Sequence, residues 1–230
     1  MGRPEWVAGG ATVLADDRPS RRASNVLERS TDRILRVQLD VKDWLANPPS
    51  VSAVRPGRCP ACGVASRPVG ACLAIHGHGR RERVQLGPGT PDGGGEVVTI
   101  LVRRYLCCAC GAVITVVPRG LIRRRLYAAA AISLALGLWG LVGLASPAVR
   151  TRVSPNSVVG DAARHHWATL GRWVAAGADG RLFPRLSVIA DEDCRVTAGR
   201  LATALIGFAP PSDRHLTRED QLYLGGARAA

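Results

Sequence analysis

The longest apolar segment of the chain, residues 126–149, contains no charged side chain. This length would allow a membrane-spanning helix. Three glycines and Pro147 dilute its hydrophobicity, however, and arginines flank both ends, so neither insertion nor a defined orientation is favoured. We therefore expect a buried helix from residue 127 to about residue 144, and keep one spanning helix over 126–149 as the alternative.

Two further helices are expected after this segment. A short helix should begin at Ser146, with serine as its N-cap and Pro147 in its first turn, and should end at the Ser-Pro-Asn break of residues 154–156. A longer helix should run from residue 157 to about residue 176. Its buried face is expected to consist of Trp167, Leu170, Trp173 and Val174. A short helix, a turn and a longer helix with basic outer positions are typical of a helix-turn-helix unit, although many all-α proteins share this pattern.

Before the apolar segment, the pattern predicts a β-hairpin. Residues 83–86 and 96–106 are two strand-like runs, the second rich in β-branched side chains, and the glycine-rich residues 87–95 separate them. The polar residues 76–81 (HGHGRR) are predicted to form a turn that leads into the first strand. Farther along the chain, residues 196–208 are expected to form another helix, with the acidic residues 191–193 at its positive N-terminus.

The cysteines indicate a metal site rather than disulfides. The chain has seven cysteines, an odd number for a chain of this length, and residues 1–33 do not resemble a signal peptide. We therefore expect a reducing, cytoplasmic location, where paired cysteines commonly bind metal.

Two of the cysteine pairs have the spacing of zinc knuckles. Cys59 and Cys62 form one C-x-x-C-G motif, and Cys107 and Cys110 form the other. Two knuckles supply four sulfur atoms, which is the ligand set of a structural zinc ion. A glycine after each second cysteine favours the turn that such a knuckle needs. The 44 residues between the pairs exceed the usual spacing, but loop length costs little entropy. We therefore predict Zn²⁺ at Cys59, Cys62, Cys107 and Cys110.

Other interpretations of the cysteines remain open. A redox dithiol would need only one C-x-x-C motif and does not explain two. Cys108 has the wrong spacing for a ligand and is expected to be a bystander, and Cys194 to be a small buried hydrophobic residue. Cys72, His76 and His78 are alternative ligands, and the two histidines could instead contact phosphate or water.

The charge of the chain is strongly positive and unevenly distributed. The formal net charge is +13, and residues 51–130 carry 12 arginines against three acidic residues. This excess points to a polyanionic partner or an anionic surface. Lys42 is the only lysine among the 31 basic residues, so a coding bias toward arginine would also explain the arginine count. The coincidence of the basic segment with the cysteine pairs is what favours nucleic-acid binding.

In order, the motifs CPACG, HGHGRRER, VRRYLCCACGAVITVVPRGLIRRRLY, SPNSVVG and WATLGRW resemble a known class of proteins. This class is the bacterial zinc-ribbon plus helix-turn-helix proteins related to transposases, and the similarity covers roughly residues 36–210. The resemblance implies zinc at the four paired cysteines and DNA binding by ribbon and helices together. Transposases of the acidic-triad type add a catalytic domain with metal-binding carboxylates, for which this chain shows no strand series.

The expected fold class is α+β: a small antiparallel zinc ribbon followed by an all-α helix-turn-helix-like region. We expect a disordered extension over 1–35, the zinc ribbon over 36–118, the helix-turn-helix-like region over 119–180, and a C-terminal helix and tail over 181–230. The predicted DNA-contacting residues are Arg80, Arg81, Arg83, Arg103, Arg104, Arg119, Arg123, Arg124, Arg125, Asn156, Arg164 and Arg172.

The predicted function is zinc-dependent DNA binding without enzymatic activity, either as a transposition-related accessory protein or as the separate DNA-binding module of a transposase. No catalytic residue set, phosphate-binding glycine loop or small-molecule site is visible in the sequence. The expected partners are DNA and a separate transposase or a second copy of the chain, and a membrane is disfavoured. The alternatives are a transcription regulator, a protein-interaction adaptor, and a membrane protein with a cytosolic zinc ribbon and one spanning helix.

Overall fold

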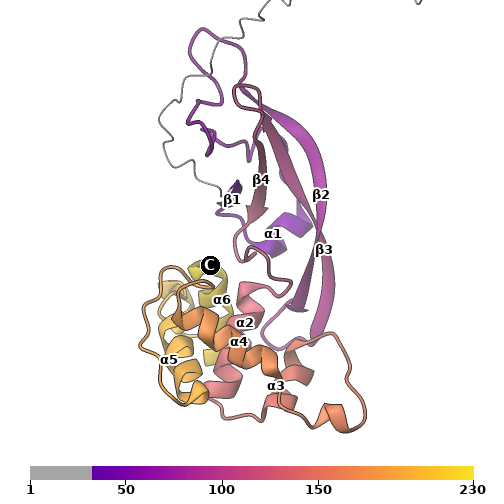
Figure 1. The fold of residues 1–230 in the computed structure, drawn as a ribbon, viewed down its shortest axis with the longest axis vertical. Coiled ribbons are helices and arrows are strands. Elements are labelled where there is room, and N and C mark those ends of the chain that lie inside the picture. The colour runs from indigo at the N-terminus through magenta and orange to yellow at the C-terminus, as the bar shows by residue number, and fades with distance from the viewer. Residues whose placement is uncertain (1–32) are drawn as a thin grey trace, which may run out of the picture.

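The computed structural model describes residues 33–230, which form a β-sheet region followed by a helical region (Figure 1). The sheet region contains β1 (Ile34–Val37), α1 (Val41–Ala46), β2 (Ile75–Pro88), β3 (Gly95–Cys107) and β4 (Val113–Pro118). The helical region contains α2 (Ala129–Gly140), α3 (Ser146–Val153), α4 (Ala168–Ala178), α5 (Cys194–Ile206) and α6 (Arg218–Ala229), with short 3₁₀ turns at Asp161–Ala163 and Pro211–Asp213. The predicted extension over 1–35 lies outside the described residues, except at its end, where Ile34 and Leu35 belong to β1.

The expected small antiparallel ribbon is wrong, although the chain is α+β. The strands form one four-stranded mixed sheet in the order β1-β4-β3-β2. β2, β3 and β4 are antiparallel neighbours, but β1 lies parallel to β4, with Ile34 opposite Thr115 and Arg36 opposite Val117. Only four residues long, β1 joins β4 across the entire cysteine-containing segment, and such a long-range pairing leaves no periodic signal in its own sequence.

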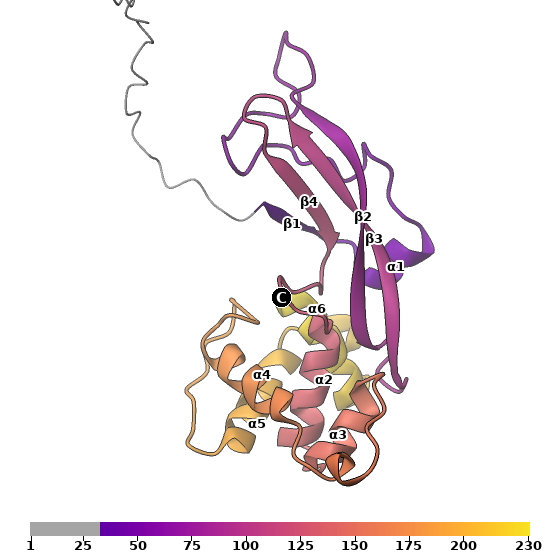
Figure 2. The same ribbon diagram turned by 45° about the vertical axis from the view of Figure 1, so that its right-hand side comes forward.

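β2 is longer than predicted, because the polar HGHGRR segment is part of the strand and not a turn before it. A β-bulge between Gly77 and Arg80 shifts the register of β2 against β3, and Gly79 within the bulge has a φ of +80°. β2 and β3 therefore form a long curved hairpin that runs the length of the sheet region (Figures 1 and 2).

The tip of this hairpin packs on the helical region instead of forming a free loop. Arg152 of α3 donates to the carbonyl oxygens of Gly93 and Pro91. On the α6 side, the Tyr223 hydroxyl donates to the Pro88 carbonyl oxygen over 2.9 Å. Burial, with the nearby carboxylates of Glu96 and Asp40, raises the pKa of Tyr223 to about 12, so its hydroxyl keeps the proton that it donates.

The helix-turn-helix unit is also wrong. α3 spans Ser146–Val153 and ends before the Ser-Pro-Asn break, as predicted, but α4 begins only at Ala168 instead of residue 157. The intervening residues 154–167 are too long for the turn of such a unit and contain Gly160 at a φ of +69°. α3 packs against α2 and the β-hairpin, whereas α4 packs against α5 and α2. Both helices contact α2, but α3 otherwise packs on the hairpin and α4 on α5, so they do not form a helix-turn-helix pair.

Helix α2 is the centre of the helical region. Every residue from Ala129 to Trp139 is buried, which is expected of a helix that is apolar on all sides. Glycines let its neighbours approach closely: a Cβ added to Gly140 would lie 2.3 Å from the backbone nitrogen of Gly199 in α5. Among residues 33–230, no helix is both long and apolar enough to cross a membrane.

Two separate groups of buried side chains stabilise the two regions. One surrounds Trp44, Tyr105 and the strands of the sheet, and the other surrounds α2 and reaches Ala229. The second group includes Leu170, Trp173 and Val174 of α4, the buried face that the sequence predicts, with Trp167 packed at its border. α5 begins after the acidic segment, and the Asp193 side chain caps it by accepting from the Arg195 N–H over 2.7 Å.

Candidate metal centre and basic surface

The first knuckle, residues 59–64, is a tight turn closed by two backbone hydrogen bonds. The Cys59 N–H donates to the Val64 carbonyl oxygen over 2.9 Å, and the Gly63 N–H donates to the Cys59 carbonyl oxygen over 2.8 Å. Gly63 has a φ of +75°, a conformation that costs glycine little and strains other residues. The positive φ of Gly63 therefore allows the tight turn that brings Cys62 close to Cys59.

The second knuckle, residues 107–112, repeats this geometry at the end of β3. The Cys107 N–H donates to the Ala112 carbonyl oxygen over 2.9 Å, and the Gly111 N–H donates to the Cys107 carbonyl oxygen over 2.8 Å. Gly111 has a φ of +70°. Two turns with the same hydrogen bonds and the same glycine conformation thus face each other, although 42 residues separate them in the sequence.

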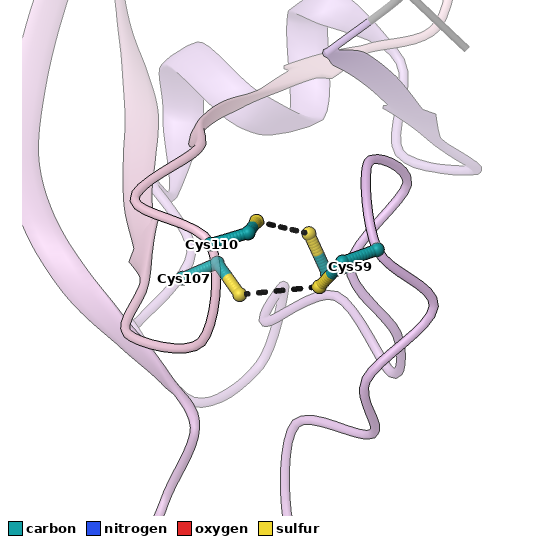
Figure 3. Close-up of side chains that lie close together, drawn as sticks. Cys59, Cys107 and Cys110 are labelled. Atoms are coloured by element: carbon teal, nitrogen blue, oxygen red, sulfur yellow. Dashed lines mark hydrogen bonds between the residues drawn. The ribbon is translucent and has the colours of Figure 1, made fainter. Parts of the chain in front are cut away.

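The four sulfur atoms of the knuckles come together (Figure 3). The Sγ atoms of Cys59, Cys62, Cys107 and Cys110 all lie within 4.8 Å of one another. The Cys59–Cys110 and Cys62–Cys107 pairs are 3.7 and 3.8 Å apart. A disulfide bond would need about 2.05 Å. Four sulfurs at about 2.3 Å from a tetrahedral ion would be about 3.8 Å apart, so the arrangement fits a metal ion.

The sheet region holds one sulfur of each knuckle and leaves the other accessible. Cys59 and Cys107 are buried in the hydrophobic core of the sheet region, whereas Cys62 and Cys110 are exposed. The second knuckle is also connected to the segment between the first knuckle and β2, because the Cys108 N–H donates to the Ala74 carbonyl oxygen over 2.9 Å. A bound ion would therefore join two segments that are already anchored.

The thiols of the centre do not ionise alike. Burial would raise the pKa of Cys59, but the N–H groups of Ala61 and Cys62 bond its sulfur, and its pKa falls to about 7. Burial and the neighbouring sulfurs raise the pKa of Cys110 to about 12. The Val64 N–H lowers the pKa of Cys62, but burial and the sulfurs of Cys59 and Cys107 outweigh it, so that pKa is raised. One thiolate forms readily, and further negative charge is resisted unless a cation compensates it.

The alternative ligands are not part of this group. Cys72, Cys108 and Cys194 are exposed free thiols, and neither they nor His76 and His78 join the four sulfurs among the described residues. The expectation that Cys194 is buried is wrong, because it occupies the first position of α5 and points to solvent.

Several of the predicted DNA-contacting arginines are occupied within the fold. Arg103 donates from both Nε and Nη2 to the Pro49 carbonyl oxygen, over 3.0 and 2.6 Å. Arg119 forms an ion pair with Asp40 at 3.3 Å. These guanidinium groups bond to the protein itself, so the prediction that they contact DNA receives no support from the structure.

Four arginines project from one face of the sheet, which we call the arginine face. Arg81 and Arg83 of β2 lie opposite Val102 and Ile100 of β3, and Arg104 follows two residues after Val102. Because side chains two residues apart share a face, these three arginines lie on the same side. The same rule across β4 adds Arg36 of β1, since Arg104 is opposite Thr115 and Arg36 is opposite Val117.

Electrostatics agree with this placement. Burial, followed by the like charges of Arg36 and Arg81, lowers the pKa of Arg83, so the three groups are close enough to repel one another. The Arg83 guanidinium donates to the carbonyl oxygens of Ile122 and, over 3.4 Å, Arg125. None of the strand positions between Arg81 and Arg36 on this face is acidic.

The remaining predicted residues lie around or away from this face. Arg123 and Arg124 are exposed in residues 122–125, the segment whose carbonyl oxygens accept hydrogen bonds from Arg83. Arg80 is also exposed, but it lies on the other face of the sheet, where it pairs with Arg103 of β3. Three more lie exposed on or before α4: Asn156, Arg164 and Arg172. They belong to the helical region, at the end of the molecule remote from the knuckles (Figure 1).

Arg36 is the member of the arginine face that sequence reasoning missed. It lies outside the dense arginine segments, in a strand of four residues, and only the pairing of β1 with β4 brings it beside the others. Its Nε donates to the Leu121 carbonyl oxygen over 3.2 Å. No signal within residues 34–37 identifies this position.

Comparison of the chain with protein-family models, with curated proteins and with solved structures finds no match in any of the three. The resemblance to transposase-related zinc-ribbon proteins therefore stays a prediction.

Proposed function

We propose that the protein binds one zinc ion through Cys59, Cys62, Cys107 and Cys110. The observation that carries this proposal is the meeting of four sulfurs, 3.7 and 3.8 Å apart in two pairs, from two knuckles of the same geometry. An all-sulfur, closed set of four ligands is typical of structural zinc and leaves no open position for a substrate. The ion would then brace the sheet rather than perform chemistry.

We further propose that the braced sheet binds DNA through the arginine face. Arg36, Arg81 and Arg104 present guanidinium groups from three strands, and none of the described strand positions between them on this face is acidic. Guanidinium groups suit phosphate because they donate several parallel hydrogen bonds and keep their charge. An array on a rigid sheet would contact the phosphate backbone, which sets affinity and position more than sequence choice. The resemblance adds the expectation that the natural target belongs to a mobile element.

The test compares two double variants that remove the same charge. Fluorescence anisotropy with a labelled DNA duplex, over a series of salt concentrations, measures the slope of log K against log salt. Arg81→Gln with Arg104→Gln should reduce the magnitude of this slope by about 2, since each lost phosphate contact releases about one counterion fewer. Arg164→Gln with Arg172→Gln should leave the slope unchanged.

The opposite result would place the interface on the helices, and the absence of salt-dependent binding to DNA would refute the proposal. Selection of bound sequences from a random pool would then separate a role in transposition from one in transcription.

A protein-interaction adaptor is the second candidate, because the other face of the hairpin exposes apolar side chains. Val84, Val97 and Leu101 are 42%, 59% and 41% exposed, and the strand register places all three on the face opposite the arginines. A protein partner would cover this patch. Two results together would favour the adaptor function over DNA binding. The chain would fail to bind DNA, and the double variant Val97→Ser, Leu101→Ser would no longer bind a protein that the wild type captures.

A further inference from the structure

A cleft of about 520 Å³ lies where β1 meets the C-terminal end of the helical region. Figure 1 shows β1 close to the end of α6. Four arginines from four different segments line the cleft: Arg36 of β1, Arg119 after β4, Arg185 before α5, and Arg228 in the last turn of α6. Gln38 adds an uncharged amide to the same wall.

The positive charge of this cleft is only partly compensated. None of the lining side chains is acidic, but Ala230, which carries the C-terminal carboxylate, also lines the cleft, and among the described residues Asp40 forms an ion pair with Arg119. The Arg119 Nε is buried and has no hydrogen-bond partner among the described residues. Arg185 and Arg228 are exposed, and neither side chain forms a hydrogen bond or ion pair within residues 33–230. The guanidinium groups of Arg185 and Arg228 are thus available to an anion.

Arg36 connects this cleft to the arginine face. It is close enough to Arg83 to lower the pKa of that arginine, and it also lines the cleft. Its Nε is used by the Leu121 carbonyl oxygen, but this bond leaves the two terminal nitrogens of the guanidinium group. A ligand that follows the arginine face from β2 to β1 would therefore reach the cleft without crossing an acidic strand position.

We infer that this cleft binds phosphate groups. Arginine side chains from separate segments can surround a phosphate from several directions, and each charge-assisted hydrogen bond is stronger than a neutral one. The phosphates could belong to a nucleic-acid backbone that continues from the arginine face, or to a free polyphosphate. The first source rests on the proposed function, whereas the second does not.

The experiment uses the metal-loaded full chain and two probes, pyrophosphate and a labelled DNA duplex. Arg185→Gln with Arg228→Gln removes two exposed cleft charges that form no hydrogen bond or ion pair within the described residues, so the variant should remain folded. Isothermal titration with pyrophosphate should show an affinity loss of roughly tenfold or more for this variant, since two charge-assisted bonds are lost. The Arg81→Gln, Arg104→Gln variant should bind pyrophosphate as the wild type does. Metal content is measured before and after titration, because pyrophosphate also binds metals.

The DNA arm identifies the source of the phosphate. If the backbone occupies the cleft, the Arg185→Gln, Arg228→Gln variant loses DNA affinity and its salt slope falls by about 2. If this variant loses pyrophosphate binding alone, the ligand is a free polyphosphate. If the wild type binds pyrophosphate but no DNA, the cleft remains a phosphate site and the proposed function is refuted. Unchanged binding of both probes by the variant would refute the cleft as a phosphate site.

Discussion

The loss of one metal ligand should release the ion and loosen the sheet region. Cys110→Ser replaces an exposed sulfur whose Sγ lies 3.7 Å from that of Cys59, and a serine hydroxyl does not ionise near neutral pH to replace a thiolate. The matched control is Cys108→Ser, since Cys108 lies in the same knuckle, is also exposed and is not one of the four sulfurs.

The magnitude follows from the length of chain that the ion closes. Cys59 and Cys110 are 51 positions apart. In the chain-entropy treatment of a cross-link, closing a loop of that length stabilises the folded state by roughly 4 kcal/mol. Typical domains are stable by only about 5–15 kcal/mol, so the loss is a large fraction. At a urea dependence of about 2 kcal/mol/M, the unfolding midpoint of the sheet region should fall by about 2 M.

Three measurements check this reasoning. Metal analysis should find about one zinc per chain in the wild type and in Cys108→Ser, and none in Cys110→Ser. Urea titration should show the shift only in Cys110→Ser and in chelator-treated wild type. Hydrogen exchange should lose protection around residues 59–64 and 107–112, while α2, which belongs to the other hydrophobic core, keeps its own. Equal metal content in the two variants, or full stability after chelation, would refute a structural metal at these four sulfurs.

Two further predictions concern the packing of the helical region. Gly140→Ala should destabilise the protein by about 1–3 kcal/mol, because its Cβ would lie 2.3 Å from the backbone nitrogen of Gly199; Gly171→Ala, with open space around its Cβ, should stabilise α4 by up to about 1 kcal/mol. Thermal unfolding measures both, and equal effects would contradict the close approach of α2 and α5. Tyr223→Phe removes the hydrogen bond to the Pro88 carbonyl oxygen, so it should lower the free energy of unfolding by about 1 kcal/mol and speed hydrogen exchange at the hairpin tip. Unchanged exchange there would show that this bond does not hold the tip.

The meeting of the four cysteines could be predicted because its signal is local. The spacing of Cys59 and Cys62, repeated by Cys107 and Cys110, makes each pair able to reach one ion, and Gly63 and Gly111 mark the positive φ that each turn requires. The buried helix could also be predicted, because an uncharged apolar segment that glycines and a proline make less hydrophobic is most stable in a protein core. In both cases the relevant physics acts within a few residues or depends on composition alone.

The arrangement of the arginines could not be read in this way. Arg103 and Arg104 are neighbours in sequence, yet one bonds to the Pro49 carbonyl oxygen and the other joins the arginine face, because adjacent strand residues point to opposite sides. Arg36 reaches that face only through the parallel pairing of β1. The late start of α4 has a local cause instead, since Gly160, at a φ of +69°, interrupts a helix that would begin at residue 157. Spacing along the chain therefore specified which cysteines meet, whereas strand register, which depends on contacts between distant segments, decided which charges share a face of the sheet.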